Sequence, residues 1–392
     1  MAGGPRRRQY EGLEFYPDPY NAPGSPQYLN LWTGFDVRPA PNPDRKYYKT
    51  FHDHLLNNVC DGDEALFRWL FAFLAHIVQR PRERLGIALV LRGKRGAGKT
   101  KVGEVIGALF KRHWFLVDSA RYVTGQFNAH MASCLMLQAD EAVWAGDKAA
   151  EGRIKGLITA PRQFIEAKGV DPVSLENYVR LMLTSNEDWV VPAGKDERRF
   201  VVFDINPRCA KNAAYFAEID VEMAAGGLEH LLGDLLAFNL DSVDLRNFPR
   251  TEALLEQKFN SLSSVDSWWL DRLMSGTTTR DGDKWERIIP TDKLFNDYIA
   301  VSDQVGIKRK NAQISLGSAL KRLLPDAIKR AKHTMLVDDR RDGLVKKRVL
   351  CYFLPSLTDA RALFETELEQ KIEWPPEDEH DVIEGESDDV VE

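Results

Sequence analysis

The sequence contains few cysteines, and they are not arranged as a disulfide framework or a zinc site. Its 392 residues include four, Cys60, Cys134, Cys209 and Cys351, which lie far apart, form no C-x-x-C pair and have no neighbouring histidine cluster. This spacing argues against a structural zinc ion and indicates a reducing compartment.

Long apolar runs are also missing. The most apolar run, residues 67–78, is too short to span a bilayer and contains Arg68 and His76. Residues 1–20 include arginines but lack the apolar core of a secretory signal. We therefore expect a cytoplasmic protein with no membrane partner.

Positive charge is missing from the C-terminus. Residues 373–392 contain ten Asp or Glu and no Lys or Arg, so the remainder carries a net charge of +4 although the whole chain carries −6. Residues 291–355 hold fourteen basic and seven acidic residues. A basic body with an acidic tail suits a nucleic-acid partner. The alternative is a surface that is merely well solvated.

A glycine-rich stretch dominates what the sequence does contain. Residues 93–100 read GKRGAGKT, which satisfies the pattern G-x-x-x-x-G-K-[ST]. An apolar run of strand length precedes it, and an amphipathic helical pattern follows. This order forms a phosphate cradle, in which Lys99 reaches the β- and γ-phosphates of ATP and Thr100 binds Mg²⁺. The predicted nucleotide-binding residues are Gly93, Gly96, Ala97, Gly98, Lys99, Thr100 and Asp140.

Two acidic residues follow a later apolar run, residues 134–139, about forty residues after the glycine loop. Asp140 is predicted to hold Mg²⁺, and Glu141 to orient and deprotonate the attacking water. A strand ending in two carboxylates can also be a helix N-cap. Its position after a P-loop favours the catalytic interpretation.

The next apolar run, residues 179–184, leads into Asn186, which could hydrogen-bond the attacking water and the γ-phosphate or simply form a turn. Arg198 and Arg199 precede a further strand, and a guanidinium there could neutralise charge on the γ-phosphate. A surface salt-bridge cluster is the alternative for these arginines.

The pattern along the chain predicts an α/β protein. Short apolar runs alternate with helical stretches from about residue 86 to 205, as in a parallel sheet of five strands covered on both faces. The five runs are residues 87–91, 114–117, 134–139, 179–184 and 200–203, and the glycine and proline of residues 165–172 predict a turn before the fourth run. Residues 51–79 predict two helices with a break at residues 60–63, the second ended by Pro81. The second helix is apolar on nearly every side and is either buried or an oligomer contact.

The predicted divisions are an extended arm (1–49), a helical segment (50–85), a P-loop ATPase core (86–250), a winged-helix-like DNA-binding domain (251–357) and an acidic disordered tail (358–392). Within the winged-helix-like domain we expect helices at residues 264–274, 292–301 and 316–324, followed by a hairpin of two strands at residues 334–337 and 345–353.

The motifs and their spacing resemble those of a known protein family. The phrases DEAVWAGDK, IKGLIT, IEAKGVD, LTSNEDW and DERRF, with the glycine loop, are similar to the superfamily 3 helicases of viruses and mobile elements. The likeness is greatest to the helicase region of phage-type primase-polymerase proteins and covers residues 28–240.

The resemblance implies an AAA+ core, hexameric rings, ATP hydrolysis between subunits and 3′ to 5′ movement on single-stranded DNA, with forked DNA as a substrate. It assigns Asn186 as a sensor, Arg198 or Arg199 as a finger given in trans, and Lys168 as a hairpin lysine that contacts DNA. Lys155 is a second candidate for DNA contact or a helix-surface residue. Only 92 residues precede the P-loop, so priming by this sequence is not expected, and a separate primase or polymerase is a possible partner.

Two rival functions share the P-loop. A DNA-binding AAA+ initiator or loader would use every ATP-site residue without unwinding DNA. A small-molecule kinase would show no stimulation by DNA and would leave the basic C-terminal region unexplained.

Overall fold

The computed structural model describes residues 9–141, 148–195, 197–304, 313–339 and 343–376. Contacts divide the chain into two compact units, the first formed by Met1–Ala193 with Glu197–Asn260 and the second by Gly194–Asp196 with Ser261–Glu392. The division falls between Asn260 and Ser261, whereas the sequence placed a boundary at residue 250. The helix at the start of the predicted C-terminal domain therefore belongs with the first unit.

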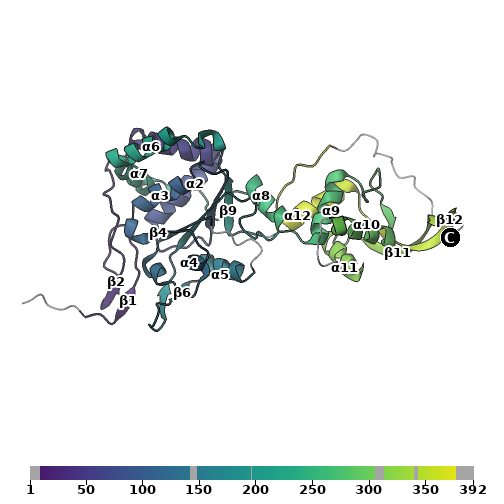
Figure 1. The fold of residues 1–392 in the computed structure, drawn as a ribbon, viewed down its shortest axis with the longest axis horizontal. Coiled ribbons are helices and arrows are strands. Elements are labelled where there is room, and N and C mark those ends of the chain that lie inside the picture. Colours follow the sequence, from purple (N-terminus) through teal and green to yellow (C-terminus); the bar gives the residue numbers. More distant parts are fainter. Residues whose placement is uncertain (1–8, 142–147, 196, 305–312, 340–342, 377–392) are drawn as a thin grey trace, which may run out of the picture. The chain divides into compact units, whose positions relative to one another are not determined.

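The first unit is built on a five-stranded parallel sheet, which confirms the predicted sheet (Figure 1). Its strands lie in the order β4-β5-β8-β3-β9. Every strand lies within two residues of its predicted position. Their bounds are Ala88–Arg92 for β3, Trp114–Val117 for β4, Met136–Asp140 for β5, Arg180–Ser185 for β8 and Phe200–Asp204 for β9.

Helices cover both faces of this sheet. One face, which includes Leu89 and Val201, packs against α2, α3, α6 and α7, and the other, which includes Val90 and Leu183, packs against α4, α5 and α8 (Figure 1). Alternate strand residues are buried on opposite sides, as expected for a parallel sheet covered twice. The bounds are Glu64–Gln79 for α2, Lys99–Ala108 for α3, Arg121–Thr124 for α4, Lys148–Thr159 for α5, Ala213–Glu222 for α6, Leu228–Ala237 for α7 and Glu252–Asn260 for α8.

The apolar helix before the glycine loop is buried, which was one of the two alternatives predicted for it. Residues 69–78 of α2 are all buried, and the side chain of Asp63 caps the helix by accepting from the backbone N–H groups of Ala65 and Leu66. Helix α1 (Lys49–Asp53) and a π-helix (His54–Val59) precede it. The two predicted helices and the break at residues 60–63 are therefore confirmed.

The described part of the N-terminal arm is packed. The sequence predicts a loosely folded arm in which residues 29–37, with Trp32 and Phe35, pack onto the segment that follows; that packing is confirmed, and the loose fold of the rest is not. Strands β1 (Gly12–Glu14) and β2 (Tyr28–Asn30) pair in parallel. Trp32 is buried, and its ring stacks on His113 at a centroid distance of 4.4 Å. Aromatic burial against a residue far along the chain gives the arm its fixed path.

A β-hairpin lies between β5 and β8 along the sequence. Its strands, β6 (Arg162–Ile165) and β7 (Val173–Glu176), pair antiparallel, and Gly169 in the connecting turn has a φ of +78°. The predicted turn at residues 165–172 is thus confirmed. Asn177, just after β7, donates to the carbonyls of Leu157 and Ala160, which anchors the hairpin base directly ahead of β8.

The second unit combines helices with a three-stranded antiparallel sheet in the order β10-β12-β11. The three predicted helices and the hairpin are present, but the first hairpin strand starts at Lys329 rather than at residue 334, and β10 was not predicted. Its core contains Trp268, Trp269 and Phe364. The bounds are Ser264–Ser275 for α9, Ile288–Pro290 for β10, Thr291–Gln304 for α10, Gln313–Leu323 for α11, Lys329–Asp339 for β11, Gly343–Phe353 for β12 and Leu357–Leu368 for α12.

Among the described residues, no helix is both long enough and apolar enough to cross a lipid bilayer. The predicted disordered tail, residues 358–392, is wrong over its first part, because residues 358–368 belong to α12 and the Phe364 side chain is buried. From residue 377 onward the predicted tail lies outside the described residues.

Candidate nucleotide site

The glycine loop joins β3 to α3, and its backbone depends on glycine. Gly93, Gly96 and Gly98 have φ values of +142°, +79° and +94°, which side chains rarely tolerate. Space is also short, because a Cβ on Gly98 would lie 2.5 Å from Cε1 of His54, and one on Gly93 would lie 2.9 Å from the carbonyl oxygen of Ile205. The pattern seen in the sequence therefore forms a loop that turns tightly into a helix N-terminus.

Lys99 opens α3, and its ammonium group lies at the centre of the loop. Its Nζ donates to the carbonyl oxygens of Gly93 (2.7 Å) and Lys94 (3.1 Å) and to Oδ1 of Asn186 (2.7 Å). Burial lowers the pKa of Lys99, while the charges of Glu141 and Asp140 act in the opposite direction. A cation held there faces any phosphate that the loop would bind.

Two oxygen donors for a magnesium ion lie side by side. The Thr100 hydroxyl donates to Oδ2 of Asp140 at 3.1 Å, and the Thr184 hydroxyl donates to Oδ1 of the same carboxylate. Hydroxyl and carboxylate oxygens are suitable ligands for Mg²⁺, which uses one or two protein groups together with substrate phosphates. The residues present therefore fit the predicted ion.

Glu141 and Asn186 meet across the ends of β5 and β8. The Asn186 amide nitrogen Nδ2 donates to Oε1 of Glu141, and Glu141 has a positive φ of +53°, uncommon for a residue with a side chain. The backbone N–H of Glu141 donates to the Thr184 carbonyl at 2.9 Å. The left-handed turn sets the carboxylate beside the amide that contacts Lys99.

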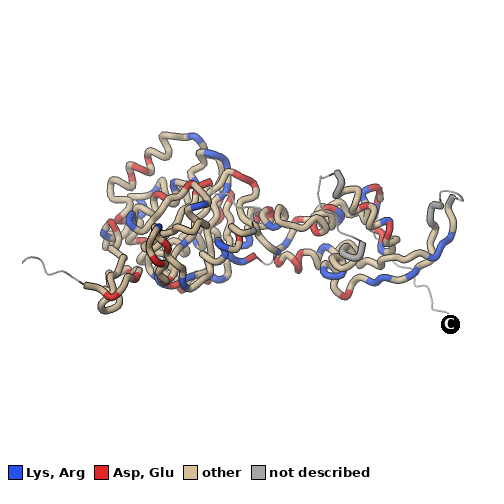
Figure 2. Tube along the Cα trace, turned by 60° about the horizontal axis from the view of Figure 1, so that its bottom comes forward, with Lys and Arg blue, Asp and Glu red and all other residues tan. Residues whose placement is uncertain are grey.

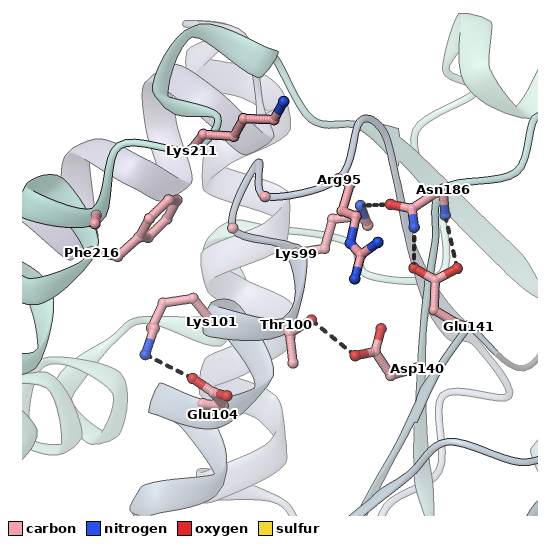
Figure 3. A pocket seen from close by; sticks show the side chains of 13 residues that line it. Arg95, Lys99, Thr100, Lys101, Glu104, Asp140, Glu141, Asn186, Lys211 and Phe216 are labelled. Carbon is pink, nitrogen blue, oxygen red and sulfur yellow. Dashed lines mark hydrogen bonds and ion pairs between the residues drawn. The ribbon is translucent and has the colours of Figure 1, made fainter.

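These side chains line a single cavity of about 510 Å³ (Figure 3). Arg95 lies near Glu141 and Asn186, whereas Lys211 and Phe216 lie on the opposite side of the glycine loop (Figure 3). None of these three residues was predicted from the sequence to line the site. The end of β9 lies beside the end of β3, so residues soon after β9 could have been expected near the site.

A buried polar cluster supports the loop from behind. His54 is fully buried, its Nε2 lies 3.3 Å from the carbonyl oxygen of Gly98, and its Nδ1 accepts from the Asn58 amide at 2.9 Å. Asn58 also contacts Tyr215 Oη (3.1 Å) and Cys209 Sγ (3.2 Å). Burial lowers the pKa of His54 to about 4, so the imidazole is neutral near pH 7.

The predicted arginines do not line this cavity in their own chain. The Arg199 guanidinium pairs with the buried Glu197 carboxylate at 3.3 Å, and the Arg198 side chain is exposed. The pair with Glu197 supports the salt-bridge alternative for Arg199, and the exposure of Arg198 leaves both of its alternatives open.

Of the two lysines predicted to contact DNA, one is exposed and the other forms an ion pair. Lys168 is exposed in the turn between β6 and β7. Lys155 is paired with Glu151 one helical turn away in α5 and lies 3.9 Å from Glu197. The helix-surface interpretation of Lys155 is therefore the better supported of its two alternatives.

Comparison with known proteins identifies relatives of this chain. Residues 91–199 match a family model described as a family of unknown function (DUF5906). The chain is homologous to the DNA primase-polymerase of Nitratiruptor phage NrS-1. The two sequences are 25% identical over 297 residues, which is 70% of this chain and 40% of that protein. The chain thus spans less than half the length of that curated relative.

Solved structures share the fold. The apo structure of the C-terminal region of NrS-1 matches with a TM-score of 0.62 and 20% sequence identity, over 88% of this chain and 85% of that one. An A-form apo structure of the same region matches with a TM-score of 0.61 and 20% identity, over 88% and 85% of the two chains. The likeness extends over both units described above.

Proposed function

We propose that this chain is an ATP-dependent DNA helicase of the superfamily 3 type, with an AAA+ core, that moves along single-stranded DNA during phage or mobile-element replication in the host cytoplasm. Similarity to a phage DNA primase-polymerase suggests a phage replication protein. The observation that carries the proposal is the convergence of Lys99, Asp140, Glu141 and Asn186 on one cavity.

In this proposal the cavity binds ATP with Mg²⁺. Lys99 contacts the β- and γ-phosphates, and Thr100 and Asp140 hold the ion. Glu141 orients the attacking water and accepts its proton. Asn186 contacts both Lys99 and Glu141, so it is placed to respond to the presence of a γ-phosphate. Phe216 and Lys211 form the wall assigned to the nucleoside.

Movement on DNA is assigned to the β6–β7 hairpin. The exposed Lys168 would grip a backbone phosphate as a point charge. The hairpin runs directly into β8, which ends at the Asn186 sensor, so a change at the γ-phosphate could tilt it. In a homo-hexamer, the exposed Arg198 would complete the site of a neighbouring subunit.

The second unit is assigned to DNA binding. Its element order, α9-β10-α10-α11-β11-β12 with a three-stranded sheet, supports the proposed winged-helix-like fold.

The test compares two lysine variants in ATPase and fork-unwinding assays. Lys168→Ala should leave ATP hydrolysis without DNA within a few-fold of wild type, but abolish stimulation by single-stranded DNA and strand displacement. Lys155→Ala is the matched control, because its ammonium is already paired with Glu151. It should retain both activities.

Three outcomes would contradict parts of the proposal. Wild-type unwinding by Lys168→Ala would place the DNA path elsewhere, and loss of its basal hydrolysis would place Lys168 in the nucleotide site. DNA-stimulated hydrolysis by the wild-type protein with no strand displacement on any fork would instead support the initiator or loader.

A further inference from the structure

The β11–β12 hairpin of the second unit carries a cluster of basic residues on one of its faces, while Lys329 and Lys347 lie on the other. Side chains alternate along a strand, and directly paired residues share a face. Arg330 pairs with Tyr352, Thr334 with Arg348, and Leu336 with Lys346, while Lys332 pairs with Leu350. Four basic residues therefore share one face, here called the cationic face: Arg330, Lys332, Lys346 and Arg348. The register also places one acidic residue, Asp338, on this face at its far end, where it pairs with Leu344.

All four side chains of the cationic face are exposed. Within the described residues, no carboxylate forms an ion pair with any of them, and the Arg330 guanidinium lies 6.0 Å from the Tyr352 ring centroid. Arg322 on the adjacent helix α11 differs, because it binds both Asp266 and Glu367. Lys and Arg recur along both strands of the hairpin (Figure 2). Four like charges held on a narrow ribbon repel one another, and a polyanion relieves that repulsion.

A pocket of about 390 Å³ lies at the base of this face, between α11 and the hairpin. Lys321, Lys329 and Arg330 line it together with Ser318. Gly317 lets the helix approach the hairpin closely, because a Cβ there would lie 3.0 Å from Tyr352 Oη. Arg330 belongs to both the pocket and the cationic face, so the two form one continuous basic surface.

The dimensions and chemistry of this surface fit duplex DNA. Eleven residues per strand span about 36 Å, close to one turn of B-DNA at roughly 34 Å. Single-strand sites add exposed aromatic rings on which bases stack. Here the one aromatic residue on the described part of the face, Tyr352, is only 3% exposed. The far end instead exposes Leu336 (57%) and Leu344 (71%), and apolar side chains of this kind contact the grooves of duplexes.

We propose that the cationic face and its basal pocket form a duplex-DNA-binding site, in which the hairpin rather than α11 supplies most phosphate contacts. This deepens the DNA-binding role proposed above for the second unit, but it requires neither ATP hydrolysis nor Lys168. Each phosphate neutralised changes the slope of log K against log salt by about 0.9. Four contacts contribute a slope of about 3.6, or roughly 150-fold in affinity between 50 and 200 mM salt.

The experiment measures anisotropy of a labelled 24-base-pair blunt duplex and of its single strand, without nucleotide, on the full chain carrying Lys168→Ala. In this background the proposed single-strand contact is absent, so a failure of the helicase proposal cannot imitate a failure of this one. Adding Arg330→Gln, Lys332→Gln, Lys346→Gln and Arg348→Gln should reduce the salt slope for the duplex by about 3.6. Circular dichroism and basal ATP hydrolysis should be unchanged.

Neighbouring residues on one strand provide the matched control. Lys346→Gln should reduce the slope by about 0.9, whereas Lys347→Gln, which removes the same charge from the opposite face, should not. Replacing Leu336 and Leu344 by Ser should weaken duplex binding at every salt concentration with the slope unchanged. Equal effects of the two lysine variants, or an unchanged slope in the four-residue variant, would overturn the proposal. A larger loss for the single strand than for the duplex would overturn the choice of ligand.

Discussion

The buried imidazole behind the glycine loop makes stability of the first unit depend on pH. Nδ1 of His54 accepts from Asn58, and its Nε2–H faces the Gly98 carbonyl, so a second proton would set two donors against each other. Burial lowers the pKa of His54 from its ordinary 6.5 to about 4. Because the folded pKa lies below the unfolded one, this contribution to stability is complete above pH 6.5 and is lost as pH falls towards 4.

The size of the effect follows from the two pKa values. With a pKa of 6.5 in the unfolded chain and about 4 in the folded protein, protonation of His54 lowers the free energy of unfolding by about 3 kcal/mol once the pH is below both values. At pH 5 the loss is about 2 kcal/mol. Other buried groups also titrate in this range. The useful quantity is therefore the difference between wild type and His54→Gln, in which the other groups cancel.

Urea unfolding followed by circular dichroism at pH 8 and pH 5 measures this difference. The two compact units are fitted as separate transitions, because a single two-state description does not suit such a chain. The wild-type first unit should lose about 2 kcal/mol more than His54→Gln between the two pH values. Equal losses would refute the reasoning, because they would mean that His54 is protonated as readily in the folded protein as in the unfolded chain.

Two further predictions concern the nucleotide site. Mixing Arg198→Ala with Lys99→Ala protein should restore part of the ATP hydrolysis, because some subunit interfaces then combine an intact glycine loop with an intact arginine finger. If no mixing ratio restores hydrolysis in rings that exchange subunits, the result would argue against a finger in trans. Arg199→Ala should mainly lower the stability of the protein, because it removes the ion pair with Glu197. Phe216→Ala should raise the KM for ATP by roughly two- to tenfold, the value of one aromatic contact, while tripolyphosphate affinity stays constant; an equal loss for both ligands would place Phe216 away from the nucleoside.

The site residues that lie at the ends of strands could be predicted from the sequence. Asp140 and Asn186 follow apolar runs whose carboxyl ends must meet at one edge of a parallel sheet, and the glycine loop marks the same edge. Their proximity is therefore a consequence of topology. For Lys211 and Phe216 the topology gives less: it places the end of β9 beside the glycine loop, but it does not show which of the residues after β9 line the cavity.

Tertiary pairing decided the features that the sequence left open or missed. Arg198 and Arg199 are chemically identical, and only the position of Glu197 distinguishes them. Strand β10 has three residues and exists because it pairs with the end of β12. The N-terminal arm lacks any periodic pattern, and its Trp32 is fixed by His113, a contact over a long sequence separation. Local propensity carries no information about such partners.

The central claim is that the cavity at residues 93–100 binds and hydrolyses ATP with Mg²⁺, and its most direct measurement combines nucleotide binding with steady-state hydrolysis. The wild-type protein should hydrolyse ATP. Lys99→Ala should lose hydrolysis with its fold intact, and Glu141→Gln should bind ATP without cleaving it. Hydrolysis by Lys99→Ala at a rate near that of the wild type would contradict the account.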